Sequence, residues 1–339
     1  MTKAFVSGCA GPTLTRSEID FFRTEDPWGL ILFARNIETP EQVRNLTEAF
    51  REAVGRADAP VLVDQEGGRV QRLKPPHWPR YPAPKTYGDL YNRDATSGQR
   101  AAWLAGRLIA DDLYQVGITV DCVPCLDVRF PDTVDAIGDR ALSQDADVVA
   151  LLGETMANGA MAGGVLPVIK HIPGHGRARV DSHLELPRVE AALSSLESVD
   201  FRPFKALSHV SLGMTAHIVY EGIDPDTAGT QSRKIIQEII RGEIGFDGCL
   251  MSDDISMKAL GGSFEDRSGK IIEAGCDIVL HCNGDMEEMI AVAKVVPELA
   301  GEARRRCDKA LSGLQVPDPE FDRLAATEEF QTLTGWQGV

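Results

Sequence analysis

The sequence has little of several features that would place it in a special class of protein. No apolar run reaches the ~18 residues that a bilayer-spanning helix needs, and only 6% of the 339 residues are aromatic. Positive charge is also in deficit, since 35 Lys and Arg face 51 Asp and Glu, for a formal net charge of −16. Nucleic-acid binding depends on a basic surface that releases counterions. We therefore predict no nucleic-acid partner and no membrane partner.

Residues 1–7 lack the apolar core and cleavage site of a secretory signal, so we expect a cytoplasmic protein. The seven cysteines are odd in number, and most lie inside apolar runs, which predicts buried, reduced thiols rather than a disulfide framework. Cys122 and Cys125 have C-x-x-C spacing, but they lie within a strand pattern and not at the start of a helix. We predict no redox role for them.

Short apolar runs alternate with longer segments of helical period along the whole chain. The predicted strands are 4–9, 29–34, 60–64, 118–123, 165–170, 212–217, 249–252 and 278–281. The predicted helices are 17–23, 40–54, 97–116, 146–162, 195–208, 233–243, 265–274 and 286–296. Eight such units predict a single α/β domain over residues 1–339, a (β/α)8 TIM barrel with a helical segment at about 318–339 packed on it. An open doubly wound sheet is the alternative, although Gly8–Gly11 is a weak match to its phosphate-binding turn.

Polar and ionisable side chains follow the predicted strands where each one ends, and in a barrel these positions converge on one face. The two richest junctions are 168–183, with three histidines, a lysine and an aspartate, and 250–257, with two adjacent carboxylates. Burying so many polar groups is costly unless they are paired or functional. The strand-end residues are Arg35, Asn36, Asp64, Arg72, Asp127, Arg140, Lys170, His171, His217, Asp253, Asp254, His281 and Asn283.

Three kinds of site compete for these residues. A metal site would use His171, His175, Asp181 and His183, although Pro173 and Gly174 interrupt the helical spacing that a zinc-binding H-E-x-x-H helix requires. A phosphate site would use Lys170, Arg72 and Arg140, without a phosphate-cradling loop. Sugar hydrolysis needs many hydrogen-bond partners for hydroxyls, a carboxylate nucleophile and a proton donor. The inventory matches this third use best.

Asp181 and His183 are suited to act together as the proton donor. In an extended loop the side chains at i and i+2 point the same way. The Asp181 carboxylate can then orient the His183 ring and favour its protonated form, which gives a general acid and base able to work near neutral pH. A second interpretation is that Asp181 only orders the loop. Gly174 and Gly176 permit backbone conformations that let this loop move over the site.

Several motifs in this order resemble those of bacterial β-N-acetylhexosaminidases of glycoside hydrolase family 3, in particular the single-domain cytoplasmic enzymes of cell-wall recycling. They span about residues 25–285 and comprise Gly29–Asn36, Val63–Arg72, Ile137–Arg140, Lys170–Gly176, Asp181–His183 and Ser252–Met257. The string from Lys170 to His183 also separates this subgroup from relatives that use a glutamate acid on a second domain. Ile172 and Asp139 depart from the Phe and Glu that are common in the family at these positions.

The resemblance implies a role for each matching residue. Asp253 matches the nucleophile that forms a covalent glycosyl-enzyme, His183 the histidine acid and base, and Asp181 its partner. The residues that match the N-acetylglucosamine-binding positions are Asp64, Arg72, Arg140, Lys170 and His171.

The family substrate is N-acetylglucosamine β-1,4-linked to 1,6-anhydro-N-acetylmuramic acid, with or without the stem peptide. The resemblance therefore implies a small-molecule muropeptide as partner, peptidoglycan recycling as the process, and no cofactor or metal. We expect a monomer. Three alternatives stay open: a metal-dependent barrel hydrolase on His171, His175, Asp181 and His183, a non-catalytic muropeptide sensor, and an enzyme that uses phosphate in place of water.

Overall fold

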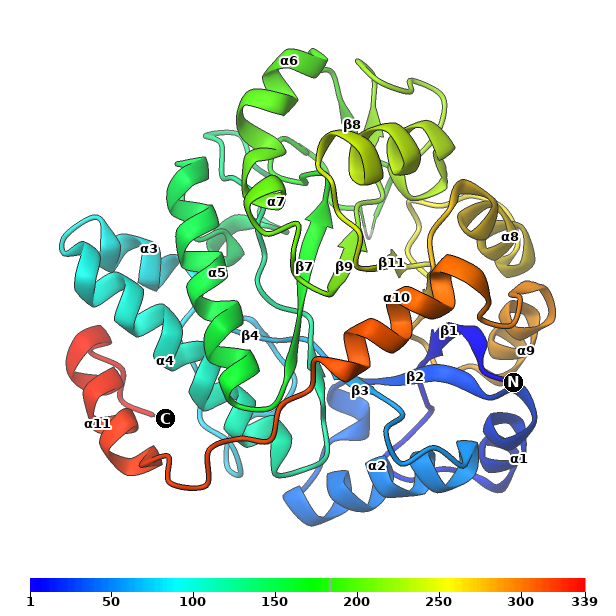
Figure 1. The fold of residues 1–339 in the computed structure, drawn as a ribbon, viewed down its shortest axis with the longest axis horizontal. Helices are drawn as coiled ribbons and strands as arrows, with labels where there is room; N and C mark the ends of the chain where they lie inside the picture. Colours follow the sequence, from blue (N-terminus) through cyan, green and yellow to red (C-terminus); the bar gives the residue numbers. More distant parts are fainter. Residues whose placement is uncertain (183, 339) are drawn as a thin grey trace.

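Eight parallel strands close into a barrel in the computed structural model, which describes residues 1–182 and 184–338 (Figure 1). The first strand pairs with both the second and the last, so the ring closes in chain order. The strands are β1 Lys3–Ser7, β2 Pro27–Leu32, β3 Val61–Val63, β6 Val120–Asp121, β7 Leu166–Ile172, β9 Leu212–Thr215, β11 Cys249–Asp254 and β12 Ile278–His281. The predicted (β/α)8 barrel is confirmed, and every predicted strand overlaps one of these.

Helices surround the barrel, as the prediction of crossover connections requires (Figure 1). They are α1 Arg16–Glu25, α2 Pro40–Val54, α4 Ala95–Tyr114, α5 Ala146–Ala162, α6 Leu193–Ser195, the π-helical η3 Leu196–Asp200, α7 Arg202–Ala206, the π-helical η5 Ile235–Glu243, α8 Phe264–Ala274 and α9 Met286–Val295. The bounds of α2 and α5 are those predicted. In α2 the reason is local: Thr39 caps the helix by accepting a hydrogen bond from the Gln42 N–H, Pro40 begins it, and Gly55 ends it with φ +68°.

The strands separate two apolar layers. Inside the barrel, side chains such as Val6, Leu62, Val168 and Met251 fill the interior, so the barrel is packed and is not a pore. Between strands and helices lies the larger layer. The buried residues of β7 and β9 face both layers, as is typical of parallel strands covered by helices. Among the described residues, no helix is both long and apolar enough to cross a membrane.

Several elements were not predicted. They are α3 Lys85–Tyr91, α10 Gly301–Ser312, the antiparallel hairpin β4 Gln65–Gly67 with β5 Val70–Gln71, the pair β8 Arg188–Val189 and β10 Val219–Tyr220, and the short 3-10 turns η1 Ala34–Asn36, η2 Gly138–Arg140 and η4 Gly229–Gln231. Helix α10 buries only Cys307 and Ala310 among mostly charged neighbours, so its apolar stripe is narrow. Cys307 contacts Cys249 of β11 at 3.3 Å between the two sulfur atoms. All seven cysteines are buried and free, as predicted.

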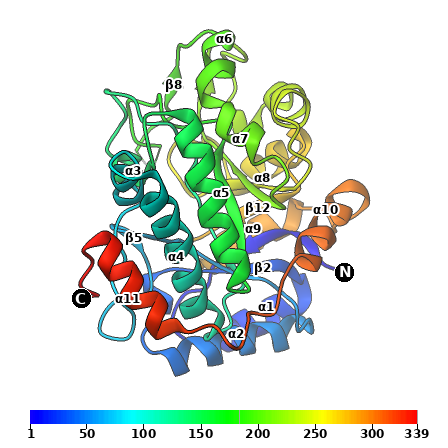
Figure 2. The ribbon, with the colours of Figure 1, turned by 60° about the vertical axis from the view of Figure 1, so that its left-hand side comes forward.

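The last helix, α11 Arg323–Thr334, lies beside α4 (Figure 2). An ion pair joins Arg100 of α4 to Glu329 at 2.7 Å. Beyond the helix, the Trp336 ring stacks on Tyr81 with 5.3 Å between centroids, and its Nε1 donates to the Arg80 carbonyl at 2.6 Å. Residues 323–336 therefore brace the segment that follows the β4–β5 hairpin.

Candidate active site

A cavity of about 360 Å³ lies where the carboxyl ends of the strands meet. Seven of the eight residues predicted for the site line it: Asp64, Arg72, Arg140, Lys170, His171, Asp181 and Asp253. The eighth, His183, lies outside the described residues. Residues that sequence reasoning did not single out also line the cavity, among them Phe33, Arg69, Met214, Met257 and Cys282. Phe33, Arg69 and Met257 lie inside the motifs quoted above, so their position in those motifs was the available signal.

Five charged side chains form one continuous network, four of them in the wall of the cavity and Glu66 behind it. Arg72 Nη2 donates to Asp64 Oδ2 at 2.9 Å, and Lys170 Nζ donates to Asp64 Oδ1 at 2.9 Å. Lys170 Nζ also lies 2.6 Å from Glu66 Oε1. Arg140 then binds Glu66 with two parallel bonds of 2.7 and 2.8 Å. Glu66 was missed from the sequence because its motif was interpreted through its ends, Asp64 and Arg72.

The ion pairs between these five side chains decide their charge states. Burial alone would raise the pKa of the Asp64 carboxyl, but Lys170 and Arg72 outweigh it and hold that pKa well below its usual range. Burial opposes ionisation of Glu66 too, yet Arg140 and Lys170 lower its pKa to about 2. The same carboxylates raise the pKa of Lys170 despite its burial. The cations are therefore already paired with carboxylates, which disfavours the phosphate site that Lys170, Arg72 and Arg140 were considered for.

The two adjacent carboxylates at the end of β11 have different environments. Asp254 is occupied by its own turn, because its oxygens accept from the Ser256 N–H at 3.0 Å and the Ser256 hydroxyl at 2.5 Å. Among the described residues, the Asp253 carboxylate accepts a hydrogen bond only from the Asp254 N–H, at 2.8 Å. Burial alone would raise the pKa of Asp253, but His217, His171 and the Asp254 N–H hold that pKa below its ordinary value. Asp253 thus presents an ionised carboxylate to the cavity, whereas the oxygens of Asp254 are held by its turn.

His217 supports this strand end from β9. Its Nε2 donates to the Asp254 carbonyl at 3.0 Å, and its Nδ1 lies 2.8 Å from Thr230 Oγ1. Burial lowers the pKa of His217, and its side chain is fully enclosed. The residue therefore positions the backbone that carries Asp253.

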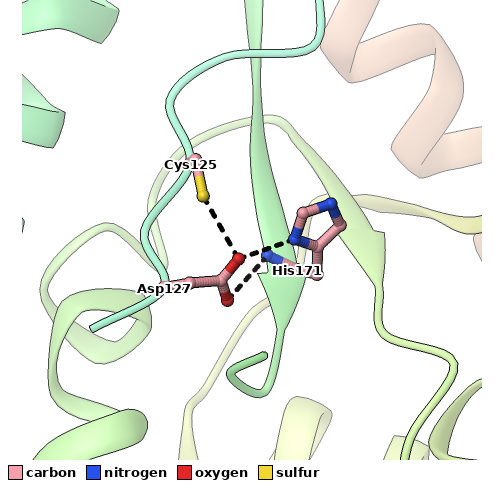
Figure 3. A group of neighbouring side chains, drawn as sticks. All are labelled: Cys125, Asp127 and His171. Carbon is pink, nitrogen blue, oxygen red and sulfur yellow. Dashed lines mark hydrogen bonds and ion pairs between the residues drawn. The ribbon is translucent and has the colours of Figure 1, made fainter. Parts of the chain in front are cut away.

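His171 is oriented by Asp127, which is fully buried (Figure 3). His171 Nδ1 lies 2.7 Å from Asp127 Oδ2, and Cys125 Sγ donates to the same oxygen at 3.2 Å. Asp127 Oδ1 accepts from the His175 N–H at 2.6 Å. Burial opposes ionisation of Asp127, but the two histidines hold its pKa well below the usual range. Nδ1 of His171 is thereby engaged, which leaves Nε2 for a ligand in the cavity.

Cys125, Asp127 and His171 are also the group, within the described part of the chain, whose potential metal ligands lie within 4.8 Å of one another. This group shares only His171 with the set considered from the sequence, His171, His175, Asp181 and His183. The hydrogen bonds between its members account for the cluster without a metal.

The loop after β7 is anchored at its base. Thr133 Oγ1 donates to the Gly176 carbonyl at 2.6 Å, and the Val134 N–H donates to the Ala178 carbonyl at 3.0 Å. A side chain at Gly176 would collide with the Val128 backbone, so this glycine serves close packing. Movement of this loop over the site stays a prediction.

Further along, the loop contacts the site through Ser182. Its Oγ lies 3.4 Å from Nε2 of His175, and its carbonyl accepts from the Ala259 N–H at 3.3 Å. Burial, with the neighbouring His171, lowers the pKa of His175 to about 4, so this ring is neutral at pH 7. Leu184 and Glu185 donate from their N–H groups to the Asp181 carbonyl. The predicted contact between Asp181 and His183 lies outside the described residues.

Other predicted strand-end residues hold loops together. Arg35 donates from Nε to the Cys9 carbonyl at 3.0 Å, and Asn36 Nδ2 donates to the carbonyls of Cys9 and Gly11. At β12, Glu288 lies 2.8 Å from His281 Nε2 and accepts from Asn283. These four residues position neighbouring loops.

Comparison with known proteins places this geometry in context. The family model "Glycosyl hydrolase family 3 N terminal domain" matches residues 25–314. The chain is 40% identical over 296 residues to a beta-hexosaminidase of Alkalilimnicola ehrlichii, with 86% of this chain and 83% of that protein covered. It is 37% identical over 286 residues to the beta-hexosaminidase of Pseudomonas aeruginosa PAO1, with coverages of 84% and 83%.

Two solved structures are similar along nearly the whole chain. NagZ from Neisseria gonorrhoeae, solved in complex with a zinc ion, has a TM-score of 0.87 and 28% identity, with 98% of both chains covered. A glycoside hydrolase family 3 β-N-acetylglucosaminidase from Paenibacillus sp. FPU-7 has a TM-score of 0.84 and 26% identity, with 97% of this chain and 66% of that chain covered.

Proposed function

Because the chain belongs to glycosyl hydrolase family 3, we propose that its cavity removes a terminal N-acetylglucosamine with retention at the anomeric carbon. The chain is a β-N-acetylhexosaminidase and a glycoside hydrolase. The observation that carries the proposed mechanism is Asp253: an ionised carboxylate in the same cavity as five sugar-binding candidates.

In this mechanism the sugar is held by the wall of paired charges. Asp64 accepts hydrogen bonds from hydroxyls, while Arg72, Arg140 and Lys170 supply fixed donors. His171 adds Nε2, since its Nδ1 is bound to Asp127. These partners bind hydroxyls away from the anomeric carbon in the ground state and in the transition state alike, so they contribute mainly to binding.

Asp253 then attacks the anomeric carbon while His183, oriented by Asp181, protonates the departing glycosidic oxygen. A covalent glycosyl-enzyme forms on Asp253 and the aglycone leaves as an alcohol. In the second step His183 takes a proton from water, and the water oxygen displaces Asp253 from the anomeric carbon. Two inversions give net retention. His183 lies outside the described residues, so its part in this scheme comes from the sequence motif.

We further propose that the substrate is N-acetylglucosamine β-1,4-linked to 1,6-anhydro-N-acetylmuramic acid or its peptides, and that the process is peptidoglycan recycling in the cytoplasm. The support is the motif set of the sequence, together with whole-length likeness to the Neisseria gonorrhoeae NagZ structure. We also propose that the enzyme acts as a monomer.

The test is hydrolysis of p-nitrophenyl N-acetyl-β-D-glucosaminide in the presence of EDTA. We expect turnover by the wild type, a loss of at least about 10³-fold in Asp253→Ala, and a far smaller loss in Asp254→Asn, whose carboxylate holds a turn. NMR should find the β-anomer as the first product. Activity that disappears with EDTA would favour the metal-dependent alternative. Binding without turnover would favour the sensor, and a sugar phosphate as product would favour phosphorolysis.

A further inference from the structure

Glu66 differs in position from the other four side chains of the charged network. Its side chain is fully buried in β4, and it is absent from the described residues that line the cavity, whereas Asp64, Arg72, Arg140 and Lys170 line it. A ligand in the cavity therefore meets the cations that Glu66 holds, and not Glu66 itself.

Glu66 supplies most of the anchoring of Arg140. Nη2 and Nε of Arg140 both bind its carboxylate, at 2.7 and 2.8 Å. The other described contact is from Nη1 to the Ala136 carbonyl at 3.0 Å. Such a two-bond pair fixes the plane of a guanidinium as well as its position. Removing the carboxylate leaves Arg140 with one carbonyl and freedom to rotate.

Lys170 depends on Glu66 in a similar way. Its ammonium lies between two carboxylates, 2.6 Å from Glu66 and 2.9 Å from Asp64. With Glu66 neutral, the attraction becomes one-sided and the ammonium shifts toward Asp64. Asp64 would then be more fully occupied by Lys170 and Arg72, at the expense of hydrogen bonds to a sugar hydroxyl.

Backbone contacts on both sides of Glu66 prevent its carboxylate from moving together with Arg140 or Lys170. Gln65 N–H donates to Asp121 at 2.9 Å, and the Gln65 side chain accepts from the N–H groups of Arg72 and Leu73. Gly67 has φ +95° and lies against the Pro82 carbonyl, where a side chain does not fit. The carboxylate of Glu66 is thus a fixed reference point to which Arg140 and Lys170 adjust.

Charge balance adds a second reason. The network of five charged side chains contains three cations and two carboxylates, so the net charge of this network is +1. Neutralising Glu66 raises the net charge to +2 at unchanged burial and leaves two buried cations without their shared partner. Breaking such a pair from one side is costly, because the remaining charge is poorly solvated.

We propose that Glu66 is a positioning residue for substrate binding, which sets the sugar-binding geometry of Lys170 and Arg140 from behind the cavity wall. This inference rests on the proposed function and names the residue on which its binding geometry depends. Lys170 and Arg140 act on hydroxyls and not on the reacting carbon. Loss of Glu66 therefore weakens binding in the ground state and in the transition state together, which changes KM more than kcat.

The experiment compares Glu66→Gln with a matched control, Glu18→Gln. Glu18 is buried like Glu66, but it holds the loop between β1 and α1, where it accepts from the Ala10 N–H, the Thr15 N–H and the Thr15 hydroxyl. For Glu66→Gln we expect KM for p-nitrophenyl N-acetyl-β-D-glucosaminide and Ki for N-acetylglucosamine to rise at least tenfold, with kcat within about threefold. Glu18→Gln should lower the melting temperature and leave KM and Ki unchanged.

Glu66→Asp is the conservative variant. Its carboxylate is one methylene shorter and can serve one cation but not both, so KM should lie between the wild type and Glu66→Gln. Unchanged KM and Ki in Glu66→Gln, or equal effects in Glu66→Gln and Glu18→Gln, overturn the inference. If Glu66→Gln does not fold, Glu66→Asp alone decides, and an unchanged KM overturns the inference there too. If the wild type shows no turnover, the proposed function is refuted instead. The dissociation constants of N-acetylglucosamine for the wild type and for Glu66→Gln then decide the role of Glu66, and equal constants overturn the inference.

Discussion

Asp121, the last residue of β6, is a buried carboxyl that the site does not use directly. Its Oδ1 accepts from the Gln65 N–H at 2.9 Å, and its Oδ2 has no partner among the described residues. Burial, with the nearby carboxylates Asp64 and Glu66, raises its pKa to about 8 although Lys170 opposes this. At pH 7 the folded protein therefore holds a proton on Asp121 that the unfolded chain has released.

This difference sets the sign of a pH effect on stability. Between about pH 4, where an unfolded aspartate titrates, and about pH 8, where the folded carboxyl titrates, the native state binds one more proton. The free energy of unfolding then falls as pH rises, by up to about 1.4 kcal/mol for each pH unit. For a chain of 339 residues, the usual unfolding entropy per residue converts this into about 2 °C per pH unit.

The variant Asp121→Asn removes the titrating group and keeps the shape. Its amide can occupy the unpartnered Oδ2 position, and its oxygen can still accept from Gln65. We expect the melting temperature of the wild type, measured relative to Asp121→Asn by circular dichroism, to fall steadily from pH 5 to pH 8 and then to level off. The comparison cancels the carboxylates with lowered pKa, which destabilise both proteins at acid pH. Parallel curves for the two proteins from pH 5 to pH 9 would show that Asp121 is ionised in the fold, and would refute the reasoning.

Two further changes test other parts of the structure. Asp127→Asn should lower kcat/KM roughly 10- to 100-fold, because an amide cannot accept from His171, His175 and Cys125 as a carboxylate does. The control in steady-state kinetics is Asp132→Asn, which changes an exposed carboxylate. Equal kcat/KM values for the two variants would show that the orientation of His171 is unimportant. Trp336→Ala should lower stability by about 1–3 kcal/mol through loss of the Tyr81 stack and the Arg80 bond, and an unchanged melting curve would contradict that.

The barrel was predictable because its signals are local. Helix α2 has Thr39, Pro40 and Gly55 at its ends, and β12 consists of three apolar residues followed by His281, so both were placed at the right residues. Helix α10 was not predictable, since its apolar stripe is narrow and Cys307 contacts Cys249 of β11, which lies 58 residues away in the sequence. The π-helical form of η5 was beyond reach as well, because its sequence has the same apolar period as an α-helix.

Some features of the site were likewise predictable from the sequence, and others were not. Residue types and strand ends were enough to predict that Asp64, Lys170 and Asp253 share one cavity. Pairing was not predictable, because it depends on distances between segments: Glu66 binds Arg140, which lies 74 residues away. The sequence also offered Asp253 and Asp254 as neighbours without ranking them by environment, and the Ser256 turn now separates them. The roles of Asp181 and His183 stay predictions.

The stacking of Trp336 on Tyr81 has a consequence for how the protein is made. A ribosome synthesises the hairpin β4–β5 early, β11 with Asp253 much later, and residues 323–336 later still. The segment 78–82 that backs this hairpin contacts Trp336, and Gly68 N–H donates to the Tyr81 carbonyl. During synthesis, then, a nascent chain can close its eight-stranded ring before this side of the cavity wall has received its final support.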